Sequence, residues 1–266
     1  MARVKRRCFV KFDVTTVYIF GIPPYLFFSA LGVAFASSAF ILLLLRYEYS
    51  IPRYTKIFLL SGIGLLAGAR FFAWLAELYA GLAGDTLIYT GMALVFYGGM
   101  VGFLSTFLLL CKLWDKTVDY RVVDLAIVCF PLFHLWGRLA CFFAGCCYGM
   151  ESHSFCAIEY TNYIGGKMVT ASRIPTQLLE VGFNGLLFLV LLKLLNNKRF
   201  TGRLAIVYMI AYAIARFVME FFRADLDRGV WNGLSFSQFV SILVLVFCVA
   251  LIASIQLRKK PYEDVR

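Results

Sequence analysis

The stretch His134–Gly149, HLWGRLACFFAGCCYG, joins a long apolar run to a segment rich in glycine and cysteine. Arg138 lies inside the apolar run, where inserting an arginine into a membrane costs roughly 2.5–3.5 kcal/mol, so the side chain normally faces a partner or a wet cavity. Arg70 and Arg216 lie inside two other apolar runs. The pattern predicts a bundle of membrane helices built around buried cations. The alternative is that each arginine extends to the nearest lipid headgroups.

The composition indicates an integral membrane protein. Of the 266 residues, 62% are hydrophobic and 15% are charged, whereas soluble domains are nearer to about half apolar and about a quarter charged. The formal charge of +11 does not indicate a nucleic-acid partner. The basic residues lie in short loops between apolar runs, where cytoplasmic orientation and contact with anionic membrane lipids explain them.

Seven apolar segments are each near the roughly 20 residues that a spanning helix needs. We therefore expect an all-α polytopic membrane protein with about seven transmembrane helices. It would comprise a basic interfacial N-terminal arm (1–16), a seven-helix membrane domain (17–257) and a cytoplasmic tail (258–266). Pro23-Pro24 would kink the first segment or end a short interfacial helix. The segments are Val17–Leu45, Ile57–Leu78, Leu87–Leu110, Val122–Phe143, Pro175–Leu195, Leu204–Phe222 and Leu234–Leu257.

The basic residues between these segments predict the orientation. One side carries thirteen: Arg46, Arg53, Lys56, Lys112, Lys116, Arg121, Lys198, Arg199, Arg203, Arg258, Lys259, Lys260 and Arg266. The other side carries only Lys167, Arg173 and Arg228. The positive-inside rule then places the C-terminus in the cytoplasm, and the N-terminus and the loop 144–173 outside. The basic N-terminal arm disagrees with this count, and we interpret it as lying on lipid headgroups.

The sixth segment carries charges at helical spacing in RFVMEFFRADLDRG. Arg216, Glu220 and Arg223 are four and three residues apart, so they would share one helix face. Two arginines beside one glutamate leave one positive charge. Together with Arg138, this charge suits a phosphate gripped by guanidinium groups. The alternative is an internal ion pair that serves packing only.

Two further patterns place small or polar residues inside the bundle. Gly98 and Gly99, with Gly102, permit close approach of a helix or a ligand, and Tyr97 offers a hydroxyl to a phosphate or a glycerol group. Gln177 and Glu180 open the fifth segment and face one way, into the bundle, while Gln238 opens the seventh. Helix capping is the alternative explanation for these polar residues.

Taken together, these motifs resemble the prolipoprotein diacylglyceryl transferase family. The resemblance runs from about Tyr25 to Leu257 and includes GARFF at Gly68–Phe72, YGGMVG, GRLACFFAGCCYG, PTQLLE, RFVMEFFRADLDRG and SFSQ. It implies a multi-pass enzyme of the bacterial plasma membrane. Such an enzyme moves diacylglycerol from phosphatidylglycerol to the lipobox cysteine in a prolipoprotein signal peptide and releases glycerol phosphate. We expect membrane lipids as surroundings, and neither a cofactor nor a metal.

The resemblance also implies roles for individual residues. Arg138 and Arg216 match the two essential arginines of the family and would stabilise the phosphate as charge develops on it. Glu220 and Arg223 match a supporting pair. The remaining matching positions expected at the substrate are Tyr25, Arg70, Gly98, Gly99, Cys141, Tyr148, Gly149, Gln177, Glu180 and Gln238.

Three positions depart from the family pattern. Tyr97 stands where the family has histidine before the paired glycines, Cys141 where it has asparagine, and Cys146 where it has glutamate. His134, one helical turn before Arg138, would replace the missing base by accepting the incoming thiol's proton. The alternative is a histidine that is only hydrogen-bonded within the bundle.

The clustered cysteines leave several interpretations open. Cys146 or Cys147 would act as a nucleophile if a nearby arginine lowers its pKa, or would form a disulfide with Cys141 or Cys156. They are otherwise small packing residues, and their spacing fits metal-binding patterns poorly. Two alternatives for the whole protein are a transferase with the same donor and another acceptor, and a non-catalytic phospholipid-binding protein.

Overall fold

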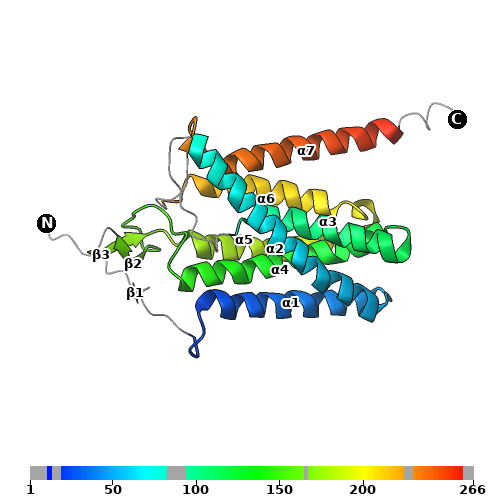
Figure 1. The fold of residues 1–266 in the computed structure, drawn as a ribbon, viewed down its shortest axis with the longest axis horizontal. Coiled ribbons are helices and arrows are strands. Elements are labelled where there is room, and N and C mark those ends of the chain that lie inside the picture. The colour runs from blue at the N-terminus through cyan, green and yellow to red at the C-terminus, as the bar shows by residue number, and fades with distance from the viewer. Residues whose placement is uncertain (1–10, 14–18, 83–93, 165–166, 225–229, 260–266) are drawn as a thin grey trace. The chain divides into compact units, whose positions relative to one another are not determined.

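The structure is a computed structural model that describes residues 11–13, 19–82, 94–164, 167–224 and 230–259. Seven α-helices lie within these residues (Figure 1): α1 Pro24–Arg46, α2 Ile51–Leu82, α3 Phe96–Asp115, α4 Tyr120–Phe143, α5 Thr176–Leu195, α6 Leu204–Glu220 and α7 Phe236–Lys259. All but α6 are long and apolar enough to cross a membrane. α6 has 17 residues and spans about 26 Å, near the lower limit for a crossing helix. The predicted all-α polytopic membrane fold is confirmed.

Two predicted segments begin more than about one helical turn later than expected. α1 starts at Pro24 rather than Val17, because proline suits the first turn of a helix, where its missing N–H is not needed. Just before α1, the backbones of Ile19 and Ile22 form two hydrogen bonds with each other across a turn. α3 starts at Phe96 rather than Leu87. Residues 83–93 lie outside the described part of the chain.

A small sheet interrupts the helices, and it was not predicted from the sequence. β1 Lys11–Asp13 pairs parallel to β2 Ile158–Ile164, which pairs antiparallel to β3 Lys167–Arg173. The signal was present, because two runs of strand-forming residues flank Gly165-Gly166, a pattern typical of hairpins. Figure 1 shows β2 and β3 beyond the ends of the helices that they connect, α4 and α5. A second pair, β4 Val230–Trp231 and β5 Leu234–Ser235, precedes α7, and a short 3-10 helix, η2 Lys198–Phe200, precedes α6.

The chain divides into two units, and each is described by itself. The first unit comprises Met1–Thr55, Val128–Asn196 and Phe221–Leu226. In it, aromatic rings pack α1 on α4: Phe28 stacks on Phe143, and Phe35 on Trp136, each with centroids 4.9 Å apart. Phe142 at the end of α4 forms a small core with two residues of β2, Ile158 and Tyr160. The sheet is therefore anchored to the end of α4.

The second unit comprises Lys56–Ile127, Asn197–Glu220 and Asp227–Arg266. Here α2 and α3 approach through glycines on both helices, Gly64 and Gly68 against Gly98 and Gly102. The backbones pack so closely that a Cβ at Gly68 would collide with the carbonyl oxygen of Gly98. Of the two explanations for the glycines of α3, close helix packing is therefore the one that this unit shows.

Candidate functional site

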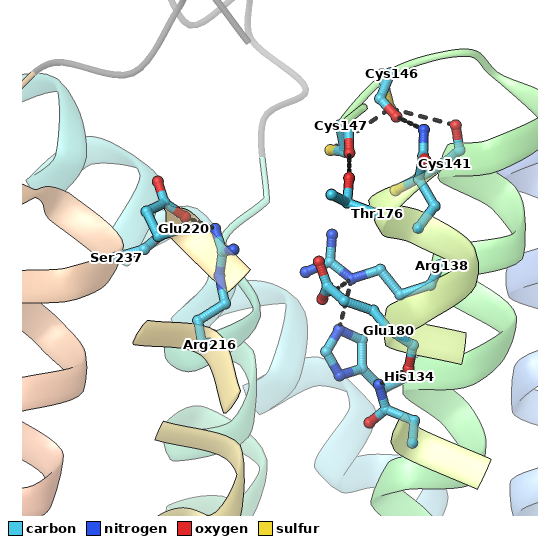
Figure 2. A network of polar contacts seen from close by, with 12 residues as sticks. His134, Arg138, Cys141, Cys146, Cys147, Thr176, Glu180, Arg216, Glu220 and Ser237 are labelled. Atoms are coloured by element: carbon cyan, nitrogen blue, oxygen red, sulfur yellow. Dashed lines mark hydrogen bonds and ion pairs between the residues drawn. The ribbon is translucent and has the colours of Figure 1, made fainter. Parts of the chain in front are cut away.

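Arg138 is the centre of a buried polar group in the first unit (Figure 2). It is 8% exposed, and its Nε lies 2.8 Å from Glu180 Oε2 on α5. The same Nε donates a hydrogen bond to His134 Nε2, one turn earlier on α4, at 3.1 Å. Because Nε2 accepts here, His134 is a neutral imidazole with its proton on Nδ1. The guanidinium group is thus held from two helices.

Glu180 and Gln177 face into the first unit together, as their spacing predicted. Gln177 is fully buried, and its Nε2 donates to the Cys146 carbonyl oxygen at 2.6 Å. The Oε1 atom of Gln177 accepts a hydrogen bond from the hydroxyl of Tyr160 at 3.3 Å. The buried Asn184, which was not predicted from the sequence, donates to the Glu180 carbonyl oxygen at 2.7 Å. The start of α5 therefore supports both Arg138 and the turn that follows α4.

That turn gathers three thiols and one phenol. The Sγ atoms of Cys141, Cys146 and Cys147 all lie within 4.8 Å of one another. The Tyr25 hydroxyl from α1 lies 2.5 Å from Cys146 Sγ. The described cysteines carry thiols rather than disulfides, and Cys156 is exposed, so the disulfides considered for this cluster are not formed in this structure.

The thiols of the turn differ in acidity. Hydrogen bonds from Cys141 and Cys146, with the positive charges of Arg223 and Arg138, hold the pKa of Cys147 well below its usual value. Hydrogen bonds to Cys141 and Cys147, together with burial, raise the pKa of Cys146. Cys147 is therefore the thiol of this cluster that most readily becomes a thiolate.

Arg223 does not share a helix face with Arg216 and Glu220, so that prediction was wrong. α6 ends at Glu220, and Arg223 lies in extended chain that pairs with Gly149. The Met150 N–H donates to the Phe222 carbonyl oxygen at 2.8 Å. Hydrogen bonds to the neighbouring loop thus replace those of another helical turn. They bring Arg223 to the cysteine cluster of the first unit.

Tyr148 and Gly149, expected at the lipid, end the same turn. The Arg173 guanidinium group lies over the Tyr148 ring, 4.6 Å from its centroid, a favourable cation–π contact. A Cβ at Gly149 would lie 2.8 Å from the Phe222 carbonyl oxygen, so only glycine permits this backbone approach. Glu151 pairs with Arg173 at 3.1 Å.

Arg216 is the centre of a second buried polar group, within the second unit (Figure 2). It is 8% exposed, and its Nη2 lies 2.8 Å from Glu220 Oε2 and 2.9 Å from the hydroxyl of Ser237 on α7. Its Nη1 is buried without an acceptor in the described part of the chain. A buried guanidinium donor without an acceptor can bind an anionic oxygen.

Tyr97 belongs to the same group. Its hydroxyl lies 2.7 Å from that of Ser241, which donates its own proton to the Ser237 carbonyl oxygen at 2.7 Å. Tyr97 is therefore the donor to Ser241. Its ring also meets Tyr212 on α6 in an edge contact, with centroids 5.1 Å apart. Tyr97 thus links three helices around Arg216. Ser237 lies in the SFSQ motif noted from the sequence, whereas Ser241 was not predicted.

The remaining predicted residues serve elsewhere or lie at the surface. Gln238 Oε1 accepts from the N–H of Ser235 at 3.1 Å, and the Ser235 hydroxyl accepts from the N–H of Gln238 at 3.2 Å. These reciprocal bonds are a capping box at the start of α7, so capping explains Gln238. Arg70 is exposed on α2, so the prediction that it is a buried cation like Arg138 and Arg216 was wrong. Gly98 and Gly99 face α2.

Comparison with known proteins gives consistent matches over most of the chain. The sequence model of the family described as prolipoprotein diacylglyceryl transferase matches residues 13–254. Phosphatidylglycerol–prolipoprotein diacylglyceryl transferase 2 of Clostridium perfringens is 31% identical over 234 residues, which cover 86% of this chain and 90% of the relative. The corresponding transferase of Campylobacter hominis is 27% identical over 259 residues, covering 90% and 89%. That of Clostridium tetani is 33% identical over 161 residues, covering 59% and 61%.

Proposed function

Because the chain belongs to the prolipoprotein diacylglyceryl transferase family, it is a multi-pass transferase of the bacterial inner membrane, and we propose that it transfers diacylglycerol from phosphatidylglycerol to prolipoproteins. The acceptor atom is the sulfur of the lipobox cysteine in the signal peptide. The relatives named above are called transferases for this donor and this acceptor. Neither a different acceptor nor a non-catalytic role is favoured by them.

The chemistry defines what the site must supply. The acceptor sulfur loses its proton and forms a bond to the glycerol carbon that bears the phosphate. The bond between that carbon and the phosphate oxygen breaks, and its electron pair leaves with glycerol phosphate. Negative charge on the leaving phosphate increases in the transition state. Fixed cations in a water-poor site therefore contribute most to the rate.

We assign the phosphate contacts to Arg138 and Arg216. Each is buried, and each is held at 2.8 Å by a carboxylate of its own unit, Glu180 or Glu220. A carboxylate at that distance fixes the plane of the guanidinium group before the substrate arrives, so less ordering is left for the binding step. The observation that carries the assignment is the buried Nη1 of Arg216 without an acceptor among the described residues.

The decisive experiment separates loss of a phosphate contact from loss of a buried ion pair. Arg138→Ala alone leaves Glu180 buried as an unpaired charge, which destabilises proteins by roughly 3–5 kcal/mol. The double variant Arg138→Ala/Glu180→Ala removes both charges. We expect it to regain thermal stability close to that of the wild type, yet to form no thioether lipopeptide from phosphatidylglycerol and a lipobox peptide. The products are measured by mass spectrometry, together with release of glycerol phosphate.

The corresponding pair on α6 provides the parallel test. Arg216→Ala and Arg216→Ala/Glu220→Ala should likewise insert in the membrane but form no product. Arg46→Ala is the control, because Arg46 lies in the last turn of α1, with its guanidinium over the Tyr47 ring, and it should transfer at the wild-type rate. A stable double variant of either pair with wild-type activity would refute the assignment.

A further inference from the structure

The three thiols of the turn after α4 have the geometry of a ligand set. Cys146 Sγ lies 3.7 Å from Cys147 Sγ, and the three sulfurs all lie within 4.8 Å. In tetrahedral zinc sites the metal–sulfur distance of about 2.3 Å places two sulfurs about 3.8 Å apart. The distance between the sulfurs of Cys146 and Cys147 is therefore that of two ligands of one ion, and the sulfur of Cys141 lies no farther than 4.8 Å from either.

We propose that Cys141, Cys146 and Cys147 bind a thiophilic d10 cation, Zn²⁺ or Cu⁺. The linear spacing of these cysteines did not suggest a metal site. The fold nevertheless brings Cys141, at the end of α4, to the two cysteines of the following turn. Each metal–sulfur bond replaces an S–H bond, and the proton passes to water, so binding needs no oxidant.

The backbone of the turn supports the proposal independently of the sulfur distances. Cys147 adopts a left-handed conformation with φ 61°, two residues after Gly145 with φ 63°. A non-glycine residue in this region is strained, and such residues are concentrated at binding sites. Contacts from α5 maintain the strained turn: the Thr176 hydroxyl donates to the Cys147 carbonyl oxygen at 2.7 Å, and Gln177 donates to that of Cys146 at 2.6 Å. The ligands are thus held in place before an ion binds.

The surroundings favour a metal–thiolate centre. Three thiolates around a divalent cation carry one net negative charge, which the positive charges of Arg223 and Arg138 beside Cys147 offset. The Tyr25 hydroxyl, 2.5 Å from Cys146 Sγ, donates to that sulfur once it is a thiolate. Hydrogen bonds of this kind orient metal ligands and tune their basicity. The bound ion would fasten the turn that carries Tyr148 and Gly149 to the end of α4.

Metal content tests the proposal without any measurement of activity. The full-length protein, purified in detergent with a tag that contains no histidine, is loaded with Zn²⁺ alone or with Cu⁺ alone under reducing conditions. After desalting we expect one ion per chain in at least one arm. Cys146→Ser and Cys147→Ser should bind at least roughly tenfold less of that ion. Cys156→Ser, which removes the exposed thiol before β2, is the matched control and should bind as the wild type does.

A second measurement uses only the wild-type protein, so it does not depend on the folding of variants. Cd²⁺ replaces Zn²⁺ and reports thiolate ligands through its ultraviolet charge-transfer band. Bound Cd²⁺ should protect Cys146 and Cys147 from alkylation, measured by peptide mass spectrometry, while Cys156 reacts regardless. The proposal is overturned if neither Zn²⁺ nor Cu⁺ is retained, if Cys147→Ser binds as the wild type does, or if Cd²⁺ leaves the alkylation pattern unchanged.

Discussion

At the scale of single residues, ion pairs and hydrogen bonds fix the positions of the two buried arginines. Arg138 pairs with Glu180, and Arg216 with Glu220 and Ser237. From the sequence, a phosphate grip and an internal ion pair were alternatives. The structure contains the ion pairs, and a phosphate grip requires the same fixed guanidinium groups. Geometry alone therefore does not distinguish a phosphate grip from an internal ion pair. The double variants distinguish them, because they remove both charges of the pair and leave transfer activity as the measured difference.

His134 provides the first residue-level prediction. Its Nε2 accepts a hydrogen bond from Arg138, so we propose that it positions that arginine rather than removing the thiol's proton. His134→Ala should lower kcat/KM by about 10- to 100-fold, because small displacements of catalytic groups are costly. His134→Gln keeps an acceptor for Arg138 and should recover most of the rate, with an unchanged pH profile.

The expected ranking supplies the control for His134. Tyr97→Phe removes one hydrogen bond to Ser241 and should reduce turnover less than His134→Ala. If His134→Gln were as inactive as His134→Ala in the lipobox peptide assay, the residue would act as a base instead. A stronger effect of Tyr97→Phe would show that the hydroxyl on α3 matters more than the imidazole on α4.

At the scale of helices, small residues and caps decide how the second unit packs. A Cβ added at Gly68 of α2 would meet the backbone of Gly98 and Gly102 of α3, and backbone cannot move aside as a side chain can. Asp124 of α4 accepts hydrogen bonds from the N–H groups of Gly202, at 2.5 Å, and Leu204, at 3.1 Å. It thereby caps α6 from a different helix.

Gly68→Ala tests the close contact of α2 and α3. Alanine favours a helix over glycine by about 1 kcal/mol, but the clash should outweigh this gain and destabilise the protein by about 1–3 kcal/mol. Gly62→Ala, six residues earlier on the same helix with nothing within 4 Å of the added Cβ, is the matched control and should be neutral or stabilising. Thermal unfolding in detergent measures both, and equal melting temperatures would contradict the packing argument.

Asp124 allows a graded test of the cap on α6. Asp124→Ala leaves two N–H groups without their acceptor and should cost about 1–3 kcal/mol. Asp124→Asn keeps one acceptor oxygen and should lie between the wild type and the alanine variant in melting temperature. Identical melting of all three proteins would mean that water replaces the carboxylate at no cost.

At the scale of the whole molecule, the orientation in the membrane stays a prediction from the positive-inside rule. Cys156 precedes β2 in the loop expected outside, and it is exposed. A membrane-impermeant maleimide should label it in intact cells. In a Cys156→Ser background, Lys198→Cys, on the exposed η2 segment expected in the cytoplasm, should react only after permeabilisation. Labelling in the reverse order would invert the topology.

The sequence by itself determined the class of the protein. Long apolar runs determine the number and the approximate ends of the helices. Each run is stable as a helix in the bilayer whatever its neighbours are, because an apolar helix satisfies its own backbone hydrogen bonds there. The burial of Arg138 follows from the cost of placing an arginine inside an apolar run, although the same argument failed for Arg70, which is exposed. Gln177 and Glu180 on one face follow from helical periodicity. The glycines of α3 indicated a close approach without saying to what.

Only the tertiary structure decided which side chains meet. Three contacts join segments that are far apart in the chain: the ion pair of Arg138 with Glu180, the contact of Tyr25 with Cys146, and the backbone bridge of Arg223 with Gly149. Local periodicity contains no information about them, because they depend on how helices and loops pack. The same holds for the three sulfurs: their spacing along the chain fits metal sites poorly, yet a left-handed turn at Cys147 helps to bring them within reach of one ion.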